Sequence, residues 1–212
     1  MIEILSGAEN MLKDYQNLLK AEEGMGPFFR LYTWEEPTVS IGLFQKERPF
    51  PVTLVRRPTG GGALLHGWDL SFSVADLKER WGKRYKDIYL RFMSCLKEHF
   101  ENLGITLEIS RYSGSYDDYF CFYYPTLGEL TYRGKKIVAC AMRVLRNSFL
   151  LHGSFFLRFD YDLAQRITGI PREILRDRLI SFEELGIGHK EILDVINDFL
   201  ASIGLCKAFD VA

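Results

Sequence analysis

The segment between residues 56 and 73 joins a glycine triplet to a pair of arginines. Its first seven residues are Arg56, Arg57, Pro58, Thr59, Gly60, Gly61 and Gly62. Glycine has no Cβ and reaches backbone dihedral angles that are closed to other residues. A ligand can therefore come close to bare backbone amides here, with guanidinium charge nearby. For the triplet by itself, the alternative interpretation is a flexible hairpin loop.

Cys121 and Lys136, fifteen residues apart, are the candidates for covalent chemistry. A reactive cysteine must lose its proton, and a free thiol titrates near ~8.5, so it requires a cation beside it. Lys136 enters an apolar run in which strand alternation places Lys136 and Cys140 on one face. If this face meets substrate, an ammonium there stabilises a thiolate and then a tetrahedral oxyanion. The alternatives are a packing role for Cys121 and an ordinary charged turn at residues 133–136.

Cys140, His66 and His152 are further candidates. Cys140 is either a rival nucleophile or a small residue in the wall of the site. The histidines could act as general bases, but we expect structural or substrate-orienting roles, because the cysteine already has a lysine. The sequence contains no His, Asp or Glu cluster with metal-ligand spacing, so we expect no metal site.

The composition narrows the class of protein. The chain has 212 residues, 47% of them hydrophobic, and its net charge of −1 argues against general binding to nucleic acid. It contains no apolar run long enough to span a bilayer and no signal-peptide pattern, so we expect no membrane span. Four cysteines without CxxC spacing indicate free thiols and a reducing cytoplasm. They are Cys95, Cys121, Cys140 and Cys206.

Hydrophobic periodicity predicts the elements that must position these residues. Ser6 and Glu9 form a candidate capping box, and a helical apolar stripe follows from Ala8 to Leu19. Further helices are expected at residues 85–103, 162–168, 172–176 and 189–205. Strands are expected at residues 28–33, 38–43, 52–56, 70–75 and 105–110, and in 129–159 with breaks at 133–134 and near 146–147.

Helices and strands are mixed in this pattern without a strict βαβ alternation. Such an order predicts an α+β fold with a mixed, largely antiparallel sheet. No linker rich in proline, glycine and serine divides the chain, so we expect residues 1–212 to form one domain.

Three ordered groups of residues resemble the signatures of the lipoate-protein ligase and octanoyltransferase superfamily. The first is the glycine-rich segment followed by His66, Leu70 and Ser73. The second comprises Cys121, Phe122, Pro125, Thr126, Glu129, Leu130, Gly134, Lys136, Ala141, Arg143, His152, Gly153 and Ser154. The third comprises Ser6, Gly7, Asn10, Asp14, Arg30, Trp34, Ser40, Gly42 and Gln45. The resemblance covers roughly residues 1–190.

This resemblance implies the catalytic-domain fold of biotin and lipoate protein ligases, with mostly antiparallel sheets packed with helices. The chain is most similar to the cysteine-dependent octanoyltransferases, which move an octanoyl chain from acyl carrier protein to a lysine of a lipoyl-accepting protein. The resemblance makes Cys121 the nucleophile and Lys136 the cation that lowers its pKa. It assigns substrate binding to Arg57, Thr59, Gly60, Gly61, Gly62, His66, His152 and Gly153.

The same resemblance implies the partners. These are octanoyl-acyl carrier protein as donor and a lipoyl-accepting protein, such as the glycine cleavage H protein or a dehydrogenase lipoyl domain, as acceptor. No cofactor is expected. We expect the glycine triplet to wall an apolar tunnel with Lys136 near its mouth. The basic stretch at residues 78–86 is either a solvated loop or a docking site for an acidic carrier.

Lipoate ligases, which activate free lipoate with ATP and Mg²⁺ through an adenylate, share the glycine-rich loop and are the alternative function. Cys121 and Phe122 stand where ligases typically have Asn and Asp, which favours the transferase. So does the spacing of Leu70 and Ser73 from His66. We also expect no room for the ligases' extra C-terminal domain, although ligases can split that domain onto another chain.

Four residues depart from the transferase pattern and leave adenylate chemistry open. They are Gly62, Gly67, Ala139 and Cys140. A non-catalytic subunit that binds a lipoyl domain is a further alternative. The presence of both Cys121 and Lys136 argues against it.

Overall fold

A computed structural model describes residues 2–112, 118–122 and 124–203 of the chain. The helices are α1 (Gly7–Glu22), α2 (Tyr85–Asn102), α3 (Tyr161–Thr168), α4 (Arg172–Arg178) and α5 (His189–Ser202), with 3₁₀ turns η1 (Lys78–Arg80) and η2 (Glu183–Leu185). The strands are β1 (Glu3–Leu5), β2 (Phe28–Trp34), β3 (Thr38–Ile41), β4 (Thr53–Arg56), β5 (Leu64–His66), β6 (Leu70–Leu77), β7 (Glu108–Ile109), β8 (Leu130–Tyr132), β9 (Lys135–Val144) and β10 (Ser148–Phe155).

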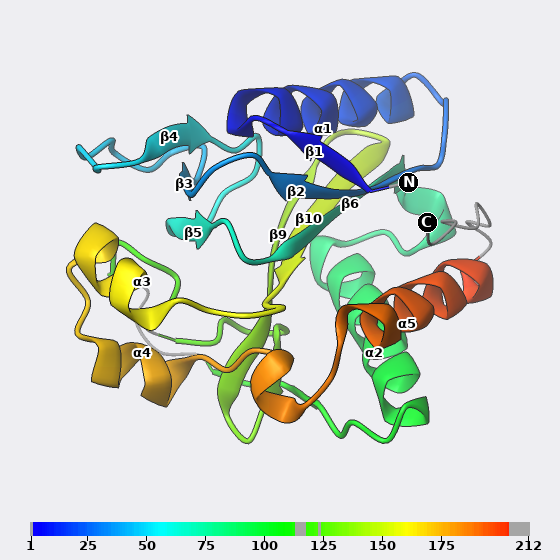
Figure 1. Cartoon of the computed structure of the whole chain (residues 1–212). Helices are drawn as coiled ribbons and strands as arrows, with labels where there is room; N and C mark the ends of the chain where they lie inside the picture. Colours follow the sequence, from blue (N-terminus) through cyan, green and yellow to red (C-terminus); the bar gives the residue numbers. More distant parts are fainter. Residues whose placement is uncertain (1, 113–117, 123, 204–212) are drawn as a thin grey trace.

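The strands form two sheets. The larger sheet has the order β1-β2-β6-β10-β9-β8-β7, and the smaller has the order β4-β3-β5. All pairs are antiparallel except β1 with β2 and β3 with β4. In Figure 1, α1 lies across one side of the large sheet, α2 and α5 lie together on the other, and α3 and α4 lie beyond the small sheet. The predicted α+β class is confirmed.

A large aromatic core fills the space between the large sheet and helices α2 and α5. Phe92 and Phe100 of α2 are eight residues apart and therefore share one helix face. The ring of Phe92 stacks on Phe72 of β6 at 5.8 Å and meets Phe199 of α5 at 4.9 Å. Phe100 packs against Phe155 of β10. The 3.6-residue period thus places both helices on the sheet.

Helix α1 covers the opposite side of the sheet. Its start is the predicted capping box: Ser6 Oγ accepts from the Glu9 backbone N–H at 3.3 Å, and the Glu9 carboxylate accepts from the Ser6 backbone N–H at 3.1 Å. Leu18 of the predicted stripe packs on Ala75 and Leu150. The local cap and the stripe therefore set both the first residue and the rotation of this helix.

The five predicted helices are present, with ends that differ by a few residues. Residues 204 and 205 of the last predicted helix lie outside the described residues. The predicted strand at 105–110 is shorter, because Gly104 has φ +83° and the Ile105 N–H turns back to the Phe100 carbonyl at 3.0 Å. Strand β5 was not predicted, since its three residues follow the glycine triplet without an alternating pattern.

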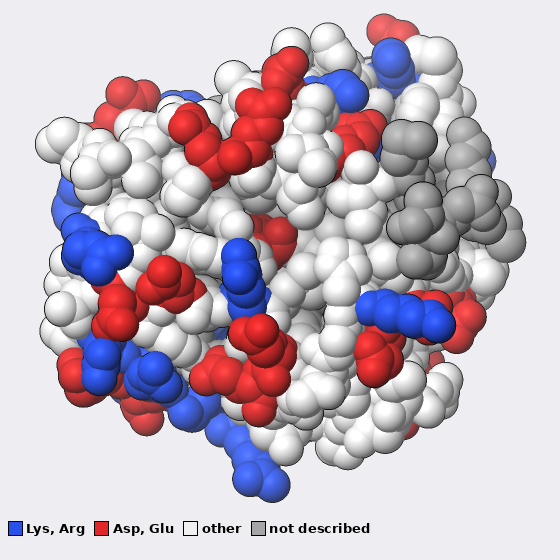
Figure 2. Space-filling view, in the orientation of Figure 1, with Lys and Arg blue, Asp and Glu red and all other residues white. Residues whose placement is uncertain are grey.

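Acidic and basic side chains are interspersed on the face shown in Figure 2. Within the described ranges, no helix combines the length and the apolar character needed to cross a membrane.

Asp14 of α1 is a fully buried carboxylate that connects four elements. It accepts hydrogen bonds from Arg30 Nη1 at 2.5 Å and from the Tyr32 hydroxyl at 2.9 Å, both on β2. Ser73 Oγ of β6 donates at 2.6 Å and His152 Nδ1 of β10 at 3.0 Å. A buried carboxylate is stable only when it is paired and hydrogen-bonded, and this one has partners for both oxygens.

We predict that Asp14→Ala lowers the free energy of unfolding by about 3–5 kcal/mol, because it removes one of the two carboxylates paired with Arg30 and leaves three buried donors without their acceptor. Urea unfolding followed by circular dichroism measures this. The control is Asp162→Ala, which removes an exposed pair with Arg172 and should cost less than about 1 kcal/mol. Equal unfolding midpoints for the two variants would contradict the prediction.

Candidate active site

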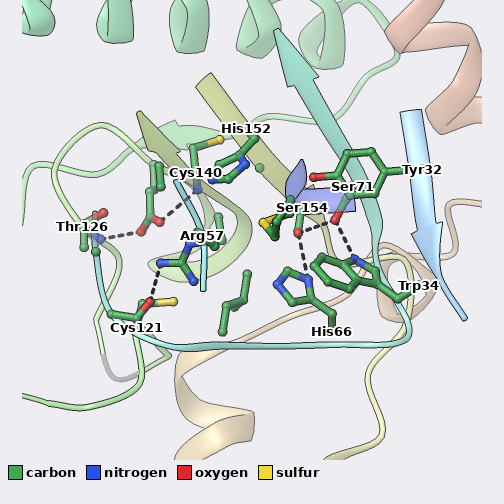
Figure 3. A pocket seen from close by; sticks show the side chains of 18 residues that line it. Tyr32, Trp34, Arg57, His66, Ser71, Cys121, Thr126, Cys140, His152 and Ser154 are labelled. Atoms are coloured by element: carbon green, nitrogen blue, oxygen red, sulfur yellow. Dashed lines mark hydrogen bonds between the residues drawn. The ribbon is translucent and has the colours of Figure 1, made fainter. Parts of the chain in front are cut away.

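Two connected hollows lie beside the glycine triplet. The inner cavity, about 80 Å³, is lined by Trp34, Arg57, His66, Cys121 and His152 among others. These side chains, labelled in Figure 3, come from β2, the glycine-rich loop, β5, the segment before β8, and β10. The outer groove, about 440 Å³, is lined by residues that include Tyr85, Tyr89, Phe120 and Met142. The two hollows share Gly61, Gly62, Cys121, Thr126, Cys140 and Ala141. Cys121 therefore stands where the inner cavity opens into the outer groove.

The glycine triplet is hydrogen-bonded to the cysteine segment. The Ala63 N–H donates to the Tyr119 carbonyl at 2.8 Å, and the Cys121 N–H donates to the Ala63 carbonyl at 2.9 Å. A Cβ at Gly62 would lie 3.2 Å from both the Cys121 nitrogen and the Tyr119 oxygen. A side chain at position 62 would therefore press on the backbone of the cysteine segment. Two motifs that are far apart in the sequence form one unit here.

Lys136 lies directly behind Cys121. Its side chain is fully buried in β9, and Nζ donates to the Cys121 carbonyl at 2.5 Å. Nζ also pairs with Glu129 Oε2 at 2.8 Å. The turn before β9, where Arg133 and Gly134 have positive φ, and an irregularity in the β8–β9 pairing bring Lys136 inward. The prediction that places Lys136 at the mouth of a tunnel is wrong, because this residue has no exposed surface and does not line either hollow.

Glu129 is part of the site, although the sequence indicated it only as a member of a family motif. It is 2% exposed. Besides pairing with Lys136, its carboxylate accepts from the Thr126 N–H at 2.6 Å and from the Cys140 N–H at 3.3 Å. A carboxylate at the start of an apolar strand, followed seven residues later by a lysine in the same run, was the signal in the sequence.

The charges around Cys121 act on its pKa in opposite directions. Burial raises the pKa of the thiol, the Lys136 ammonium lowers it, the Glu129 carboxylate raises it and the Arg57 guanidinium lowers it; the net pKa is raised. The Cys121 side chain is partly exposed. Burial nevertheless has the largest effect on its pKa. Burial lowers the pKa of Lys136, but Glu129 and Cys121 outweigh it, so that pKa is raised. Lys136 thus counteracts the burial of Cys121 without overcoming it.

His152 connects the Asp14 carboxylate to the glycine-rich loop. Its Nδ1–H donates to Asp14 at 3.0 Å, so Nε2 is free to accept from Thr59 Oγ1 at 2.7 Å. Burial lowers the pKa of His152, against the opposing effect of Asp14, which favours the neutral ring required for this arrangement. Thr59 is fully buried and lines neither hollow. These contacts favour an orienting role for His152.

His66 holds the same loop from the other side. Its Nδ1–H donates to Asp69 at 2.9 Å and its Nε2 accepts from Ser40 Oγ at 2.7 Å. Ser40 Oγ in turn accepts from Arg57 Nη1 at 2.8 Å. The Trp34 ring stacks on the imidazole with centroids 3.9 Å apart. His66 is therefore a buried, fully bonded group that positions Arg57 through Ser40.

The remaining predicted residues lie around Cys121. Gly60 borders the outer groove only, while Gly61 borders both hollows. A Cβ at Gly153 would lie 2.6 Å from Cys140 Sγ and 2.5 Å from the Ala139 oxygen. Gly153 therefore leaves room for the Cys140 side chain in the wall. Cys95, Cys121 and Cys140 are free thiols, and Cys206 lies outside the described residues.

Asp14, Asp69 and Ser40 were not assigned roles from the sequence. Asp14 lies three residues after Met11 and four before Leu18, on the apolar stripe of α1. A carboxylate on such a stripe requires a buried partner, and this was the available signal. In residues 2–112, 118–122 and 124–203, no group of three or more His, Cys, Asp or Glu side chains could hold a metal ion.

The chain was compared with known proteins. The family model of the lipoyl protein ligase A/B catalytic domain matches residues 8–203. The octanoyltransferase LipM of Carboxydothermus hydrogenoformans is 36% identical over 176 residues, which are 76% of this chain and 65% of that protein. LipM of Brevibacillus brevis is 31% identical over 211 residues, covering 90% of this chain and 76% of that protein. The chain thus spans about two thirds to three quarters of the length of these relatives.

Solved structures share the fold. Lipoate-protein ligase A bound with ATP superposes with a TM-score of 0.74 at 19% identity, covering 96% of this chain and 83% of that one. A putative lipoate protein ligase from T. acidophilum with bound lipoic acid superposes with a TM-score of 0.72 at 20% identity, with the same coverage.

The pairing of His66 with Asp69 predicts a pH dependence of stability. Burial alone would raise the pKa of Asp69, but its interactions with His66 and with hydroxyl donors outweigh it and lower the pKa to about 2. The folded carboxyl therefore has a lower pKa than the unfolded one. Its stabilisation, about 2 kcal/mol, is present above the unfolded pKa near 4 and is lost as the pH falls to about 2.

Urea unfolding of the wild type and of Asp69→Asn between pH 7 and pH 2 tests this. The variant should be less stable at pH 7 and should lose less stability below pH 4 than the wild type. Asp194→Asn, on the exposed side of α5, is the control and should follow the wild-type curve. Parallel curves for wild type and Asp69→Asn would contradict the assignment.

Proposed function

The chain belongs to the lipoyl protein ligase A/B catalytic-domain family, and we propose that it transfers an octanoyl group from a carrier-protein thioester to a lysine of a lipoyl-accepting protein. The observation that carries the proposal is the position of Cys121 between the inner cavity and the outer groove, with Lys136 bonded to its carbonyl. The relatives that match most of the chain are named octanoyltransferases, which supports the same reaction.

The two hollows suit the two ends of an acyl thioester. The inner cavity offers apolar surface from Met11, Trp34, Leu64 and Ala139. Each CH₂ of an octanoyl chain buried there contributes about 0.8 kcal/mol, so chain length affects affinity directly. The outer groove would admit the arm of the donor first and the acceptor lysine afterwards. Both arms would then reach Cys121 from the same side.

The transfer divides into two steps at Cys121. The thiol gives up its proton, its sulfur bonds to the thioester carbonyl carbon, and the carrier's sulfur leaves and takes a proton. The amine of the acceptor lysine then bonds to the same carbon, forming an amide and releasing Cys121, which regains a proton. A nucleophilic cysteine lowers the barrier by replacing one difficult displacement with two easier ones.

Lys136 and Glu129 support these steps from behind the thiol. The ammonium favours the thiolate, and the paired carboxylate keeps Lys136 charged and directed at the Cys121 carbonyl. The same carboxylate limits how far the thiol pKa is lowered. No ATP, Mg²⁺ or other cofactor is part of the proposed reaction.

A basic rim borders the outer groove and supports an acidic carrier as the donor. Lys83, Arg84 and Lys86, at the start of α2, are exposed, and the neighbouring Tyr85 lines the groove. Arg84 is paired with Asp87 at 2.9 Å, so Lys83 and Lys86 supply the remaining positive charge. Complementary charge accelerates encounter between partners. The acceptor would be a lipoyl-accepting protein. The cytoplasmic location of the protein stays a prediction.

We predict that incubation with octanoyl-acyl carrier protein, without ATP, adds an octanoyl mass to the wild-type protein at Cys121. Cys121→Ser should lose the thioester adduct and the transfer activity. Cys140→Ser is the matched control, because Cys140 lines the same hollows, and it should keep both. Intact-mass measurement and peptide mapping after hydroxylamine treatment, which cleaves thioesters, identify the site.

Other outcomes of the same experiment would assign a different function. An adduct on Cys140 would reassign the nucleophile and leave the reaction class intact. Pyrophosphate release from ATP with free octanoate or lipoate would establish a ligase. A protein that is inert in both assays and binds a lipoyl domain would be a non-catalytic subunit.

For the basic rim, we predict that the double substitution Lys83→Glu and Lys86→Glu raises KM for octanoyl-acyl carrier protein about tenfold at low salt and leaves kcat unchanged. A small octanoyl thioester as donor should show no change. Lys190→Glu, an exposed charge reversal on α5, is the control. Equal KM values for all three proteins would show that the rim does not bind the carrier.

A further inference from the structure

Arg57 uses four of its five N–H groups to hold the backbone. Nη1 donates to the carbonyl and the hydroxyl of Ser40, each at 2.8 Å. Nη2 donates to the carbonyls of Gly60 at 3.1 Å and Gly62 at 2.8 Å. The fifth donor, Nε–H, is buried and has no hydrogen-bond partner among the described residues. A buried donor without an acceptor is destabilising, and an acceptor on a bound molecule would offset that cost.

The charge of Arg57 is also without a counterion. The side chain is 7% exposed, and in the described part of the chain it forms no ion pair with a carboxylate. Burial lowers its pKa, and the groups that act in the opposite direction are Cys121 and Tyr32. Tyr32 already donates to Asp14. A buried guanidinium that lacks a carboxylate is suited to an anion that forms only during the reaction.

Arg57 lies beside the thiol. Its Nη2 is 2.8 Å from the Gly62 carbonyl, and a Cβ placed on Gly62 would lie 3.5 Å from the Cβ of Cys121. Arg57 and Cys121 both line the inner cavity, where Figure 3 shows them close together. Gly62 thus contacts the Arg57 guanidinium and lies next to Cys121, which would carry the acyl group.

Lys136 is less suited to the same task. Its Nζ is fully buried, is bonded to the Cys121 carbonyl and to Glu129, and does not line the inner cavity. Moving it to the acyl oxygen would break at least one of these contacts. Arg57 Nε–H has no hydrogen bond among the described residues to give up, and its side chain lines the inner cavity.

We propose that the Nε–H of Arg57 donates a hydrogen bond to the carbonyl oxygen of the acyl group and to the oxyanion that forms from it. When the sulfur of Cys121 bonds to the carbonyl carbon, the π electrons move onto this oxygen. They return to form C=O when the carrier's thiolate leaves, and the sequence repeats when the acceptor amine attacks. Arg57 keeps its protons throughout. This inference rests on the proposed acyl transfer and gives the oxyanion to Arg57 rather than to Lys136.

We predict that Arg57→Lys slows acylation of Cys121 by octanoyl-acyl carrier protein by about 10²–10³-fold, the usual cost of one lost oxyanion donor. Rapid quenching and intact mass measure this rate. Alkylation of Cys121 by iodoacetamide, which forms no oxyanion, should be unchanged when both proteins are compared above the thiol pKa. A purely structural role would slow both reactions equally, and that result would overturn the inference.

Arg56→Lys is the matched control. Arg56 also holds backbone carbonyls, those of Gly42, Leu43 and Gln45, but it does not line the inner cavity. Its acylation rate should match the wild type. A wild type that never forms an acyl-enzyme would overturn the proposed function and this inference with it. An active wild type with an equally active Arg57→Lys would overturn this inference alone.

A measurement on the wild type keeps the inference testable if Arg57→Lys fails to fold, as urea unfolding would show. Octanal adds to a thiol to form a tetrahedral hemithioacetal, whose oxygen takes the position of the oxyanion on Cys121. In protein labelled with ¹⁵N-arginine, octanal should shift one buried Nε–H resonance downfield. Adduct formation without such a shift would overturn the inference.

Discussion

The buried carboxylate of Asp14 is the interaction on which the site depends. It lies on the apolar face of α1 and accepts hydrogen bonds from β2, β6 and β10, so it fixes the helix against three neighbouring strands of the large sheet. Burying this charge is costly, and the cost is offset only because every donor arrives in the right geometry. A shift of α1 by one residue would separate the Asp14 carboxylate from Arg30, which would keep only its pair with Glu3 of β1. The register of the helix on the sheet is therefore strongly constrained.

Two chains of hydrogen bonds carry this rigidity to the glycine-rich loop. One runs from Asp14 through His152 to Thr59, and the other from Asp69 through His66 and Ser40 to Arg57. Each histidine is held by an aspartate at Nδ1, which leaves Nε2 as the acceptor for a hydroxyl. The loop is rich in glycine and would be flexible alone, yet it is tied at two side chains. That is how bare backbone can approach Cys121 and still keep a defined shape.

Two cations, Lys136 and Arg57, flank the proposed acyl group. They differ in whether a carboxylate is paired with them. Lys136, behind the thiol, is neutralised by Glu129, so its effect on the pKa of Cys121 is partial. Arg57, in the wall of the inner cavity, has no carboxylate partner among the described residues and one unused donor. A paired cation stabilises the resting protein, whereas an unpaired one favours an anion that appears later. The division between the two follows from the position of Glu129, which pairs with Lys136.

The sequence by itself determined the elements and the candidates for chemistry. The capping box and stripe of α1, the aromatic face of α2 and the α+β class follow from local patterns that act over a few residues. The order of motifs also indicated the family and singled out Cys121 and Lys136. Only the tertiary structure decided that Glu129 pairs with Lys136, that Gly62 touches the backbone of Cys121, and that Arg57 has one donor left over. These contacts join segments whose neighbours are set by strand pairing in the two sheets, and periodicity carries no information about which strands pair. Whether a buried polar atom is satisfied depends on all the groups around it at once, so it can be known only when the chain is folded.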